Sequence, residues 1–360
     1  MIPPLDDAAQ AIAAALAGRQ FPQAVSMAYG VLHTAIERLI AGEAEFALEA
    51  GRRLLAAAPG FDHATFLTAA AATALGRNDE AAAARAAGLA RAPQLAPFYD
   101  RLAAGRGAIR RFIPQIKCEV VADCQYDCVL CAHGDLRQGD IAYQLTLEQL
   151  RAFLTATLDS GYLIGQLAIH GSGEPLLWKH LGPGLAEIKN SGAVCWTWLT
   201  SNGLLLHRLG AEELALIDCM DISLYQGNKK LEAIREVVAG HEQKLFIVPM
   251  DDFVDTPKKL AGPAPVPCPC LCAGPMLVGD KLYLYCGPPV FGAGKLLKRD
   301  PATDLSLWTR VGPNYLERAR PLTGRLDYCG WCWANGHHQQ RARRLGQQTA
   351  GGNWKNRATA

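Results

Sequence analysis

The sequence predicts an α/β protein, namely a partial (β/α)6 barrel with an all-α domain before it and a small β-hairpin/helix domain after it. Three observations favour this fold class. The first hundred or so residues are Ala-rich and lack strand-like alternation. From residue 112 onward, strand-like runs alternate with helical stretches, as in a parallel sheet with right-handed crossovers. A Pro-rich joint at 263–270 ends that alternation.

Bulk composition excludes several classes of function. The chain has 360 residues, half of them hydrophobic, and a formal net charge of +2 with no continuous basic stripe. A nucleic-acid binder normally shows such a stripe. The first residues carry no basic and apolar leader, and the apolar runs are shorter than a membrane span. We therefore expect a cytoplasmic protein that binds neither nucleic acid nor membrane.

The N-terminal region, residues 1–108, contains an internal repeat. Gly42 and Pro59 recur as Gly76 and Pro93, both at an offset of 34 residues. A 34-residue period with Gly in a turn and Pro closing a helix resembles the tetratricopeptide (TPR) repeat. A generic helical bundle is the alternative. Stacked TPR hairpins leave a concave face that often binds peptides or partner proteins.

The predicted barrel spans residues 112–262. Its candidate strands are 112–121, 163–170, 193–200, 220–225 and 244–250. Its candidate helices are 145–160, 180–190, 211–217 and 229–240. In the first helix, Leu147, Leu150 and Leu154 recur at helical spacing, which gives one apolar face for a sheet.

Twelve cysteines need an explanation, because structural disulfides are rare in a reducing cytosol. Nine of the twelve fall into two groups, and grouped thiols of this kind are typical metal ligands. The other three, Cys118, Cys195 and Cys219, stand alone in strand-like apolar surroundings. We expect those three to be buried as small hydrophobic residues.

The first group is Cys124, Cys128 and Cys131, a C-x3-C-x2-C loop between a strand and a helix. Cubane iron–sulfur clusters usually take four thiolates, so three ligands leave one iron open to a further ligand. A zinc knuckle that recruits His133 is the alternative, although zinc sites usually use paired two-residue spacings. The loop follows a strand, and α/β sheets bind ligands at the carboxyl ends of their strands.

This loop, with three later motifs in the same order, resembles the radical S-adenosylmethionine (SAM) superfamily over about residues 112–250. The resemblance implies a [4Fe–4S] cluster held by the three cysteines and SAM, reductive cleavage of SAM to a 5′-deoxyadenosyl radical, and hydrogen abstraction from an unactivated C–H bond. The motifs are a GSGEP turn at 171–175, a TSNG strand end at 200–203 and a polar residue on the fourth strand. The residues that the resemblance assigns to SAM are Leu130, Gly173, Glu174, Ser201, Asn202 and Ser223.

Two departures from the family pattern stand out. Ser172 replaces the usual Gly of the Gly-Gly-Glu-Pro turn. After Ser223 the chain has Leu224-Tyr225-Gln226-Gly227 where relatives commonly have Asp-Gly. Substrate contacts near this strand end are therefore expected to differ from those of the better-known peptide maturases.

The second cysteine group lies in residues 263–336, which resemble the SPASM/twitch auxiliary domain of radical SAM enzymes. The resemblance implies one auxiliary [4Fe–4S] cluster, and a structural Zn(Cys)4 site is the alternative. The expected ligands are Cys272, Cys286, Cys329 and Cys332, with Cys268 as the alternate for Cys272. Cys270 is left over as a candidate hydrogen-atom donor to a substrate radical. The basic tail, 337–360, is expected to be flexible.

The predicted function is a radical SAM oxidoreductase or maturase that oxidises or cross-links a peptide and takes electrons from a flavodoxin- or ferredoxin-type reductant. One alternative is a dehydrogenase or epimerase of sugars or aminocyclitols. The non-enzymatic alternative is an iron–sulfur or zinc scaffold in which the TPR-like helices do the work.

Overall fold

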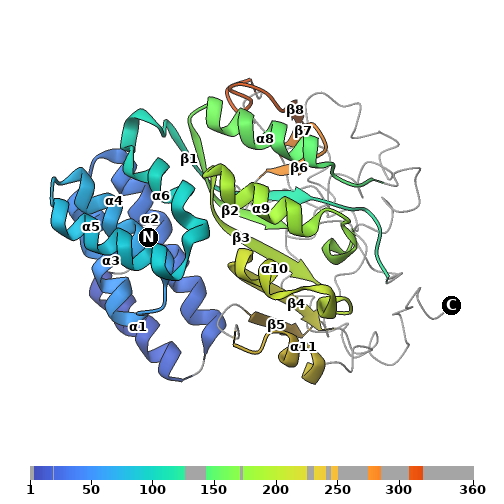
Figure 1. The fold of residues 1–360 in the computed structure, drawn as a ribbon, viewed down its shortest axis with the longest axis horizontal. Helices are drawn as coiled ribbons and strands as arrows, with labels where there is room; N and C mark the ends of the chain where they lie inside the picture. The colour runs from blue at the N-terminus through green and yellow to red at the C-terminus, as the bar shows by residue number, and fades with distance from the viewer. Residues whose placement is uncertain are drawn as a thin grey trace, which may run out of the picture.

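The computed structural model describes residues 4–18, 20–125, 143–170, 173–224, 231–240, 245–249, 275–284 and 308–318. In these ranges the chain forms a helical N-terminal region beside a mixed α/β region (Figure 1). The mixed α/β class predicted from the sequence is confirmed.

The N-terminal region consists of paired helices. They are α1 (Leu5–Ala17), α2 (Phe21–Ala41), α3 (Ala44–Ala57), α4 (Asp62–Ala74), α5 (Asn78–Arg91) and α6 (Ala96–Ala103). The starts of α3 and α5 are 34 residues apart, and so are those of α4 and α6. Gly42 and Gly76, which follow α2 and α4, both have positive φ (96° and 70°), so each supplies the left-handed residue that the turn needs. The 34-residue period is thus a period of helices, while membership of the TPR family stays a prediction.

The α/β region is built on one eight-stranded sheet in the order β5-β4-β3-β2-β1-β6-β7-β8. Its strands are β1 (Arg111–Glu119), β2 (Tyr162–Ile169), β3 (Val194–Ser201), β4 (Cys219–Leu224), β5 (Leu245–Pro249), β6 (Met276–Val278), β7 (Lys281–Tyr283) and β8 (Trp308–Arg310). Strands β1 to β5 are parallel in chain order, and β6 pairs with β1 in parallel on the other side. The pairs β6–β7 and β7–β8 are antiparallel.

The helices of this region are α8 (Leu147–Asp159), α9 (Leu181–Ser191), α10 (Ala211–Leu216) and α11 (Leu231–Val237). Helix α8 begins at a capping box: the Gln149 amide donates to Thr146 Oγ1 (3.1 Å), and the Thr146 amide donates to Gln149 Oε1 (3.0 Å). Its apolar face, with Leu150 and Phe153 fully buried, packs into one core with α9 and the sheet. Helices α8, α9 and α10 lie on the same face of the sheet (Figure 1).

The N-terminal helices pack against the amino end of the sheet. The ring of Tyr29 on α2 lies 4.6 Å from that of Trp196 on β3, centroid to centroid. Leu163, Trp196 and Cys219 belong to the same buried core as the N-terminal helices and are at most 2% exposed. The two regions therefore share a hydrophobic core.

Every predicted strand and helix of the sheet region is found within three residues of its expected bounds. The β-hairpin predicted after the barrel is found as β6 and β7, with its turn at Gly279-Asp280, where Gly279 has a φ of 62°. It does not stand apart from the sheet, because β6 extends the sheet beside β1. Closure into a partial barrel and the auxiliary domain stay predictions. None of the helices in the described ranges is both long and apolar enough to cross a membrane.

Candidate functional site

Three of the predicted motifs meet where β1, β2 and β3 end. Because these strands are parallel and adjacent, their carboxyl ends lie at one edge of the sheet (Figure 1). Cys124 follows β1, Glu174 follows β2, and Asn202 follows the last residue of β3, Ser201. Segments that are 28 to 78 residues apart in sequence are joined here by hydrogen bonds.

Glu174 is the centre of this group. One carboxylate oxygen, Oε1, accepts from the Ser201 hydroxyl (2.7 Å) and from the Leu176 amide (3.1 Å). The other oxygen, Oε2, accepts from the Asn202 amide (2.8 Å). The residue is only 2% exposed. These donors fix the carboxylate in one orientation at the strand ends.

Burial raises the pKa of Glu174, and the three donors oppose that rise only in part. All three donors are neutral, and no ion pair to Glu174 exists within the described ranges. A buried carboxylate without a countercharge is costly, and a bound cation removes that cost. The electrostatics of this group therefore favour a positively charged ligand.

Gly173 lets the turn come close to the cysteine loop. A Cβ atom at this position would lie 2.3 Å from the carbonyl oxygens of both Asp123 and Val121, which is too close for any side chain. The next amide, that of Glu174, donates to the Asp123 carbonyl (2.7 Å). Glycine is thus required for close approach of backbone to backbone.

Asn202 ties the end of β3 to the start of the cysteine loop. Its Nδ2 donates to Gln125 Oε1 (3.1 Å) and lies 3.7 Å from Cys124 Sγ, while its Oδ1 accepts from the Leu204 amide (3.0 Å). Cys124 is partly exposed. Its thiol is therefore accessible to a metal ion and is held beside the Glu174 group.

Gln125 adds an unsatisfied donor. Its Nε2 is buried and has no hydrogen-bond partner among the described residues, although its Oε1 is bonded to Asn202. Buried polar atoms are nearly always paired, so an orphan of this kind needs an explanation. An acceptor group on a ligand beside Cys124 would satisfy it.

Ser223, the remaining described residue of the predicted SAM group, lies near the end of β4 and is half-buried. It follows Ile222, which is the register partner of Ser201. The structure thus brings Gly173, Glu174, Ser201 and Asn202 together and places Ser223 one strand away.

The other predicted site residues lie outside the described residues. They are Leu130, Cys128, Cys131, Cys268, Cys270, Cys272, Cys286, Cys329 and Cys332. Within the described ranges, no group of three or more His, Cys, Asp or Glu residues could hold a metal ion. Both iron–sulfur sites therefore stay predictions, with Cys124 as the one ligand that the structure places.

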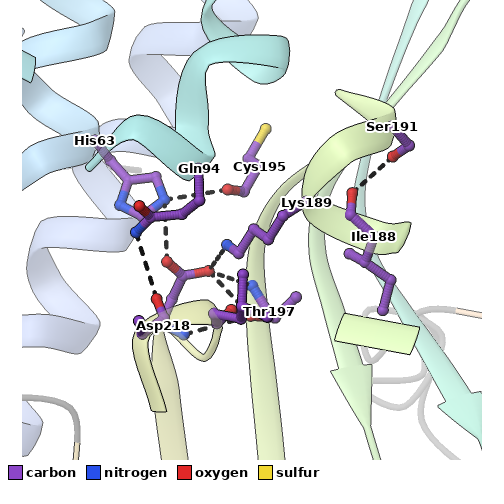
Figure 2. A network of polar contacts seen from close by, with 10 residues as sticks. His63, Gln94, Ile188, Lys189, Ser191, Cys195, Thr197 and Asp218 are labelled. Carbon is purple, nitrogen blue, oxygen red and sulfur yellow. Dashed lines mark hydrogen bonds and ion pairs between the residues drawn. The ribbon is translucent and has the colours of Figure 1, made fainter. Parts of the chain in front are cut away.

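A second polar cluster, at the amino end of the sheet, was not predicted (Figure 2). Asp218, just before β4, forms an ion pair with Lys189 of α9, and its Oδ2 accepts from the Thr197 amide (2.6 Å). His63 of α4 lies with its Nε2 3.6 Å from Asp218 Oδ1 and 3.1 Å from the Cys195 carbonyl oxygen. In the sequence His63 is isolated, and Lys189 lies in an ordinary polar run between Glu187 and Ser191, so neither residue marks this cluster.

This amino-end cluster is electrostatically balanced. Burial alone would raise the pKa of Asp218, but the charge of Lys189 and the contact with His63 bring that pKa below its ordinary value. Burial lowers the pKa of His63, against the pull of Asp218. The cluster joins the N-terminal helices to the sheet and leaves no uncompensated charge for a ligand.

The three isolated cysteines behave as predicted. Cys118, Cys195 and Cys219 are each at most 1% exposed and unbonded to one another. Burial raises the pKa of all three thiols far above the usual range, so they stay protonated. None of them is suited to bind a metal ion.

Comparison with known proteins adds two solved structures. No protein-family model matches the chain, and no curated protein matches it. The chain is similar to the crystal structure of BtrN in complex with AdoMet and 2-DOIA, at 20% identity over 38% of this chain and 56% of that one, with a TM-score of 0.31. It is also similar to the selenomethionine form of BtrN in an open conformation, at 18% identity over the same shares of both chains, with a TM-score of 0.27. The chain thus spans about half the length of each structure.

Proposed function

We propose that this chain is a radical SAM enzyme, which binds SAM and an iron–sulfur cluster at the carboxyl ends of β1, β2 and β3. The proposal rests on the C-x3-C-x2-C loop and the ordered GSGEP and TSNG motifs. The observation that carries it is Glu174, a buried carboxylate held by three neutral donors, with no cation among the described residues, next to Cys124. A scaffold protein has no need for such a group.

The described residues fit the cofactor. SAM carries an ammonium group, which matches the unbalanced charge of Glu174, and it carries a carboxylate and hydroxyls, which are acceptors for the orphan Nε2 of Gln125. The thiolate of Cys124, together with those of Cys128 and Cys131, would hold the cluster. When bound, the cluster and SAM supply a 5′-deoxyadenosyl radical that removes a hydrogen atom from a C–H bond.

The chain's own residues would position these groups. Glu174 would accept hydrogen bonds from the SAM ammonium without moving, because Ser201 and the Asn202 amide already fix its orientation. Asn202, bonded to Gln125 and close to Cys124 Sγ, would hold the cysteine loop against the strand ends. Gly173 keeps the turn close enough for these contacts. Leu130 and Ser223 complete the proposed SAM group, as packing and polar contacts respectively.

The auxiliary cluster is part of the proposal. Cys272 or Cys268, with Cys286, Cys329 and Cys332, would hold a [4Fe–4S] cluster that accepts the electron left after hydrogen abstraction. Zinc at this site is the competing assignment. A flavodoxin- or ferredoxin-type protein would supply the reducing electron.

The substrate is proposed at the level of class. A peptide, oxidised or cross-linked, is the class that the TPR-like helices and the auxiliary-domain motif favour. A sugar or aminocyclitol is the second candidate. The polar residues Thr200 and Asp221, which are register partners on one face of the sheet, favour it. Cys270 as a hydrogen donor would apply only to a redox-neutral inversion.

The test is anaerobic reconstitution followed by SAM cleavage. The protein should bind about eight irons if both clusters are cubanes, and it should release 5′-deoxyadenosine when reduced. Replacement of Cys124, Cys128 and Cys131 by Ala should halve the iron content and abolish cleavage. Cys118→Ala, which removes a buried thiol at the end of β1, is the matched control and should retain both. Cleavage that persists in the triple variant would sink the assignment.

A further inference from the structure

A polar row crosses the face of the sheet opposite α8, α9 and α10. Cys118, Ile169, Leu199 and Met220 are register neighbours that lie in the core shared with those helices, each at most 1% exposed. Successive side chains on a strand point to opposite faces. The residue that follows each of them therefore lies on the other face. These four residues are Glu119, His170, Thr200 and Asp221, and Asp221 is the register partner of Thr200. We call these four residues the open-face row.

The open-face row is neither a packed core nor an ordinary solvated surface. Glu119 is 2% exposed, whereas His170, Thr200 and Asp221 are partly exposed. Two residues earlier on each of β3 and β4, the same face carries Trp198 and Cys219, which pack against the N-terminal helices. The N-terminal region therefore covers the amino end of this face. The open-face row lies next to the covered part, toward the carboxyl ends of the strands.

The row borders the proposed SAM site. Thr200 directly precedes Ser201, which donates to Glu174. Glu119 ends β1, five residues before Cys124. A molecule bound on the row would thus lie next to the strand ends that carry the proposed radical chemistry.

The side chains define the chemistry of the ligand. Asp221 can only accept hydrogen bonds while ionised; its one side-chain partner in the described structure is Trp198, and it forms no ion pair there. Burial raises its pKa, as it does for Glu174, so a cation beside it would be stabilising. Thr200 adds a hydroxyl that can both donate and accept, and so does Ser223, which lies two residues after Asp221 on the same face of β4. Together they fit a small ligand that is rich in donors.

We propose that the open-face row binds the substrate, and that this substrate is a small amine-bearing polyol whose ammonium group contacts Asp221. The inference rests on the proposed radical SAM function and, of the two candidate substrate classes named there, selects the second over the peptide. A peptide would meet the row only through a side chain, whereas a polyol matches a compact set of acceptors and hydroxyls. Asp221 is then the residue that distinguishes an amine from a neutral analogue.

Ligand-observed NMR on the reconstituted holoenzyme with SAM bound tests this inference. The probes are glucosamine, at mildly acidic pH so that its amine is charged, and glucose as the neutral match. We expect glucosamine to bind at least about tenfold more tightly than glucose, since a charge-assisted contact of moderate strength gives that ratio. Asp221→Asn, which keeps the shape of the side chain, should reduce that preference to about one. Asp159→Asn, on the exposed end of α8, is the control and should leave the preference intact.

Each other outcome overturns the inference. Equal binding of the two sugars, an unchanged preference in Asp221→Asn, or no signal from either sugar would each do so. Saturation transfer to an unstructured Lys-containing peptide but to neither sugar would point to the peptide class instead. SAM binding by the wild-type protein, measured first, keeps the two proposals apart. A protein that fails to bind SAM contradicts the proposed function, whereas one that binds SAM without the amine preference contradicts only the substrate assignment.

Discussion

Two buried carboxylates contact the same strand, β3, and their surroundings differ in one respect. Asp218 contacts Thr197 in the middle of the strand, and Glu174 contacts Ser201, its last residue. Asp218, at the amino end, is paired with Lys189 and faces His63 (Figure 2). Glu174, at the carboxyl end, has only neutral donors, from Ser201, Asn202 and Leu176. Both residues are almost completely buried, yet the pKa of Asp218 lies below its ordinary value and that of Glu174 lies above it.

The difference separates a structural site from a binding site. At the amino end the chain supplies both charges, so the cluster is complete and holds two regions of the protein together. At the carboxyl end the chain supplies one charge and orients it, so the countercharge has to come from a ligand. Buried charges are otherwise paired or neutralised, which is why the missing partner of Glu174 is informative and the mere presence of a carboxylate is not.

The largest expected effect is a loss of folding stability when the whole contact between the N-terminal helices and the sheet is removed. Removal of residues 1–108 would expose Leu163, Trp196 and Cys219 and would take His63 away from Asp218. Burial of a large apolar side chain is worth about 1.5–3 kcal/mol, so loss of this interface consumes much of the stability of an ordinary domain. We expect the truncated sheet region to lose its near-UV circular dichroism and to aggregate. A truncated protein that unfolds cooperatively at the wild-type temperature would mean that the interface contributes little.

Asp218→Asn should destabilise the protein by about 3–5 kcal/mol, because it leaves the ammonium of Lys189 buried without a countercharge. Denaturant unfolding followed by fluorescence measures the change. The double variant Asp218→Asn, Lys189→Met should recover a large part of the loss, since both charges are then gone. If the single and the double variant are equally unstable, the ion pair is not what holds this cluster.

Glu174→Gln should show the opposite pattern. The uncharged amide removes the attraction for the SAM ammonium, and we expect SAM affinity to fall about 100-fold, which corresponds to about 2.7 kcal/mol. The free energy of unfolding should change by no more than about 1 kcal/mol, because the loss of one good acceptor for the Asn202 amide is offset by removal of an uncompensated buried charge. Calorimetric titration with SAM and denaturant unfolding give the two numbers. A large loss of stability with unchanged SAM affinity would place Glu174 among the structural carboxylates.

The two ends also differ in how far the sequence predicted them. Glu174, Ser201 and Asn202 were predicted because the GSGEP and TSNG motifs resemble those of a known family. Parallel strands then bring such strand ends together whatever the details of packing. The bounds of the strands and helices followed from periodicity, which is a local signal. The cluster of His63, Lys189 and Asp218 gave no such signal, because its members come from three elements whose contact depends on how the N-terminal helices dock.

The open-face row falls between these cases. Each of its residues sits on a predicted strand, but the sequence alone does not say which alternate positions face the helices. That assignment needed the registers Thr200↔Asp221 and Cys118↔Ile169, together with the core that Leu199 and Ile169 form with α8 and α9. The polar character of Asp221 was visible in the sequence, whereas the face it lies on was not.

The smallest expected effect is a pH dependence at the amino end. Burial, the main cause, lowers the pKa of His63 in the folded protein, while in the unfolded chain a histidine has a pKa of about 6.5. Below that pH the unfolded state binds one more proton than the folded state at this position, so stability falls as the pH falls, by up to about 1.4 kcal/mol per pH unit. The contribution is therefore fully present above the unfolded pKa and is lost in mild acid. Glu174 acts in the reverse direction, since burial raises its pKa and the folded state therefore binds a proton at this position more readily than the unfolded state. The effect of His63 must therefore be isolated as a difference between variants. Unfolding free energies of the wild type and of His63→Phe, measured between about pH 7.5 and pH 5.5, should converge as the pH falls. Phe keeps the ring packing against Tyr29 but loses both the titration and the polar contacts of Nε2, so only the wild type loses stability in mild acid through this residue. Parallel curves for the two proteins would show that His63 is protonated when folded, and the balanced charge of the amino-end cluster would then need another account.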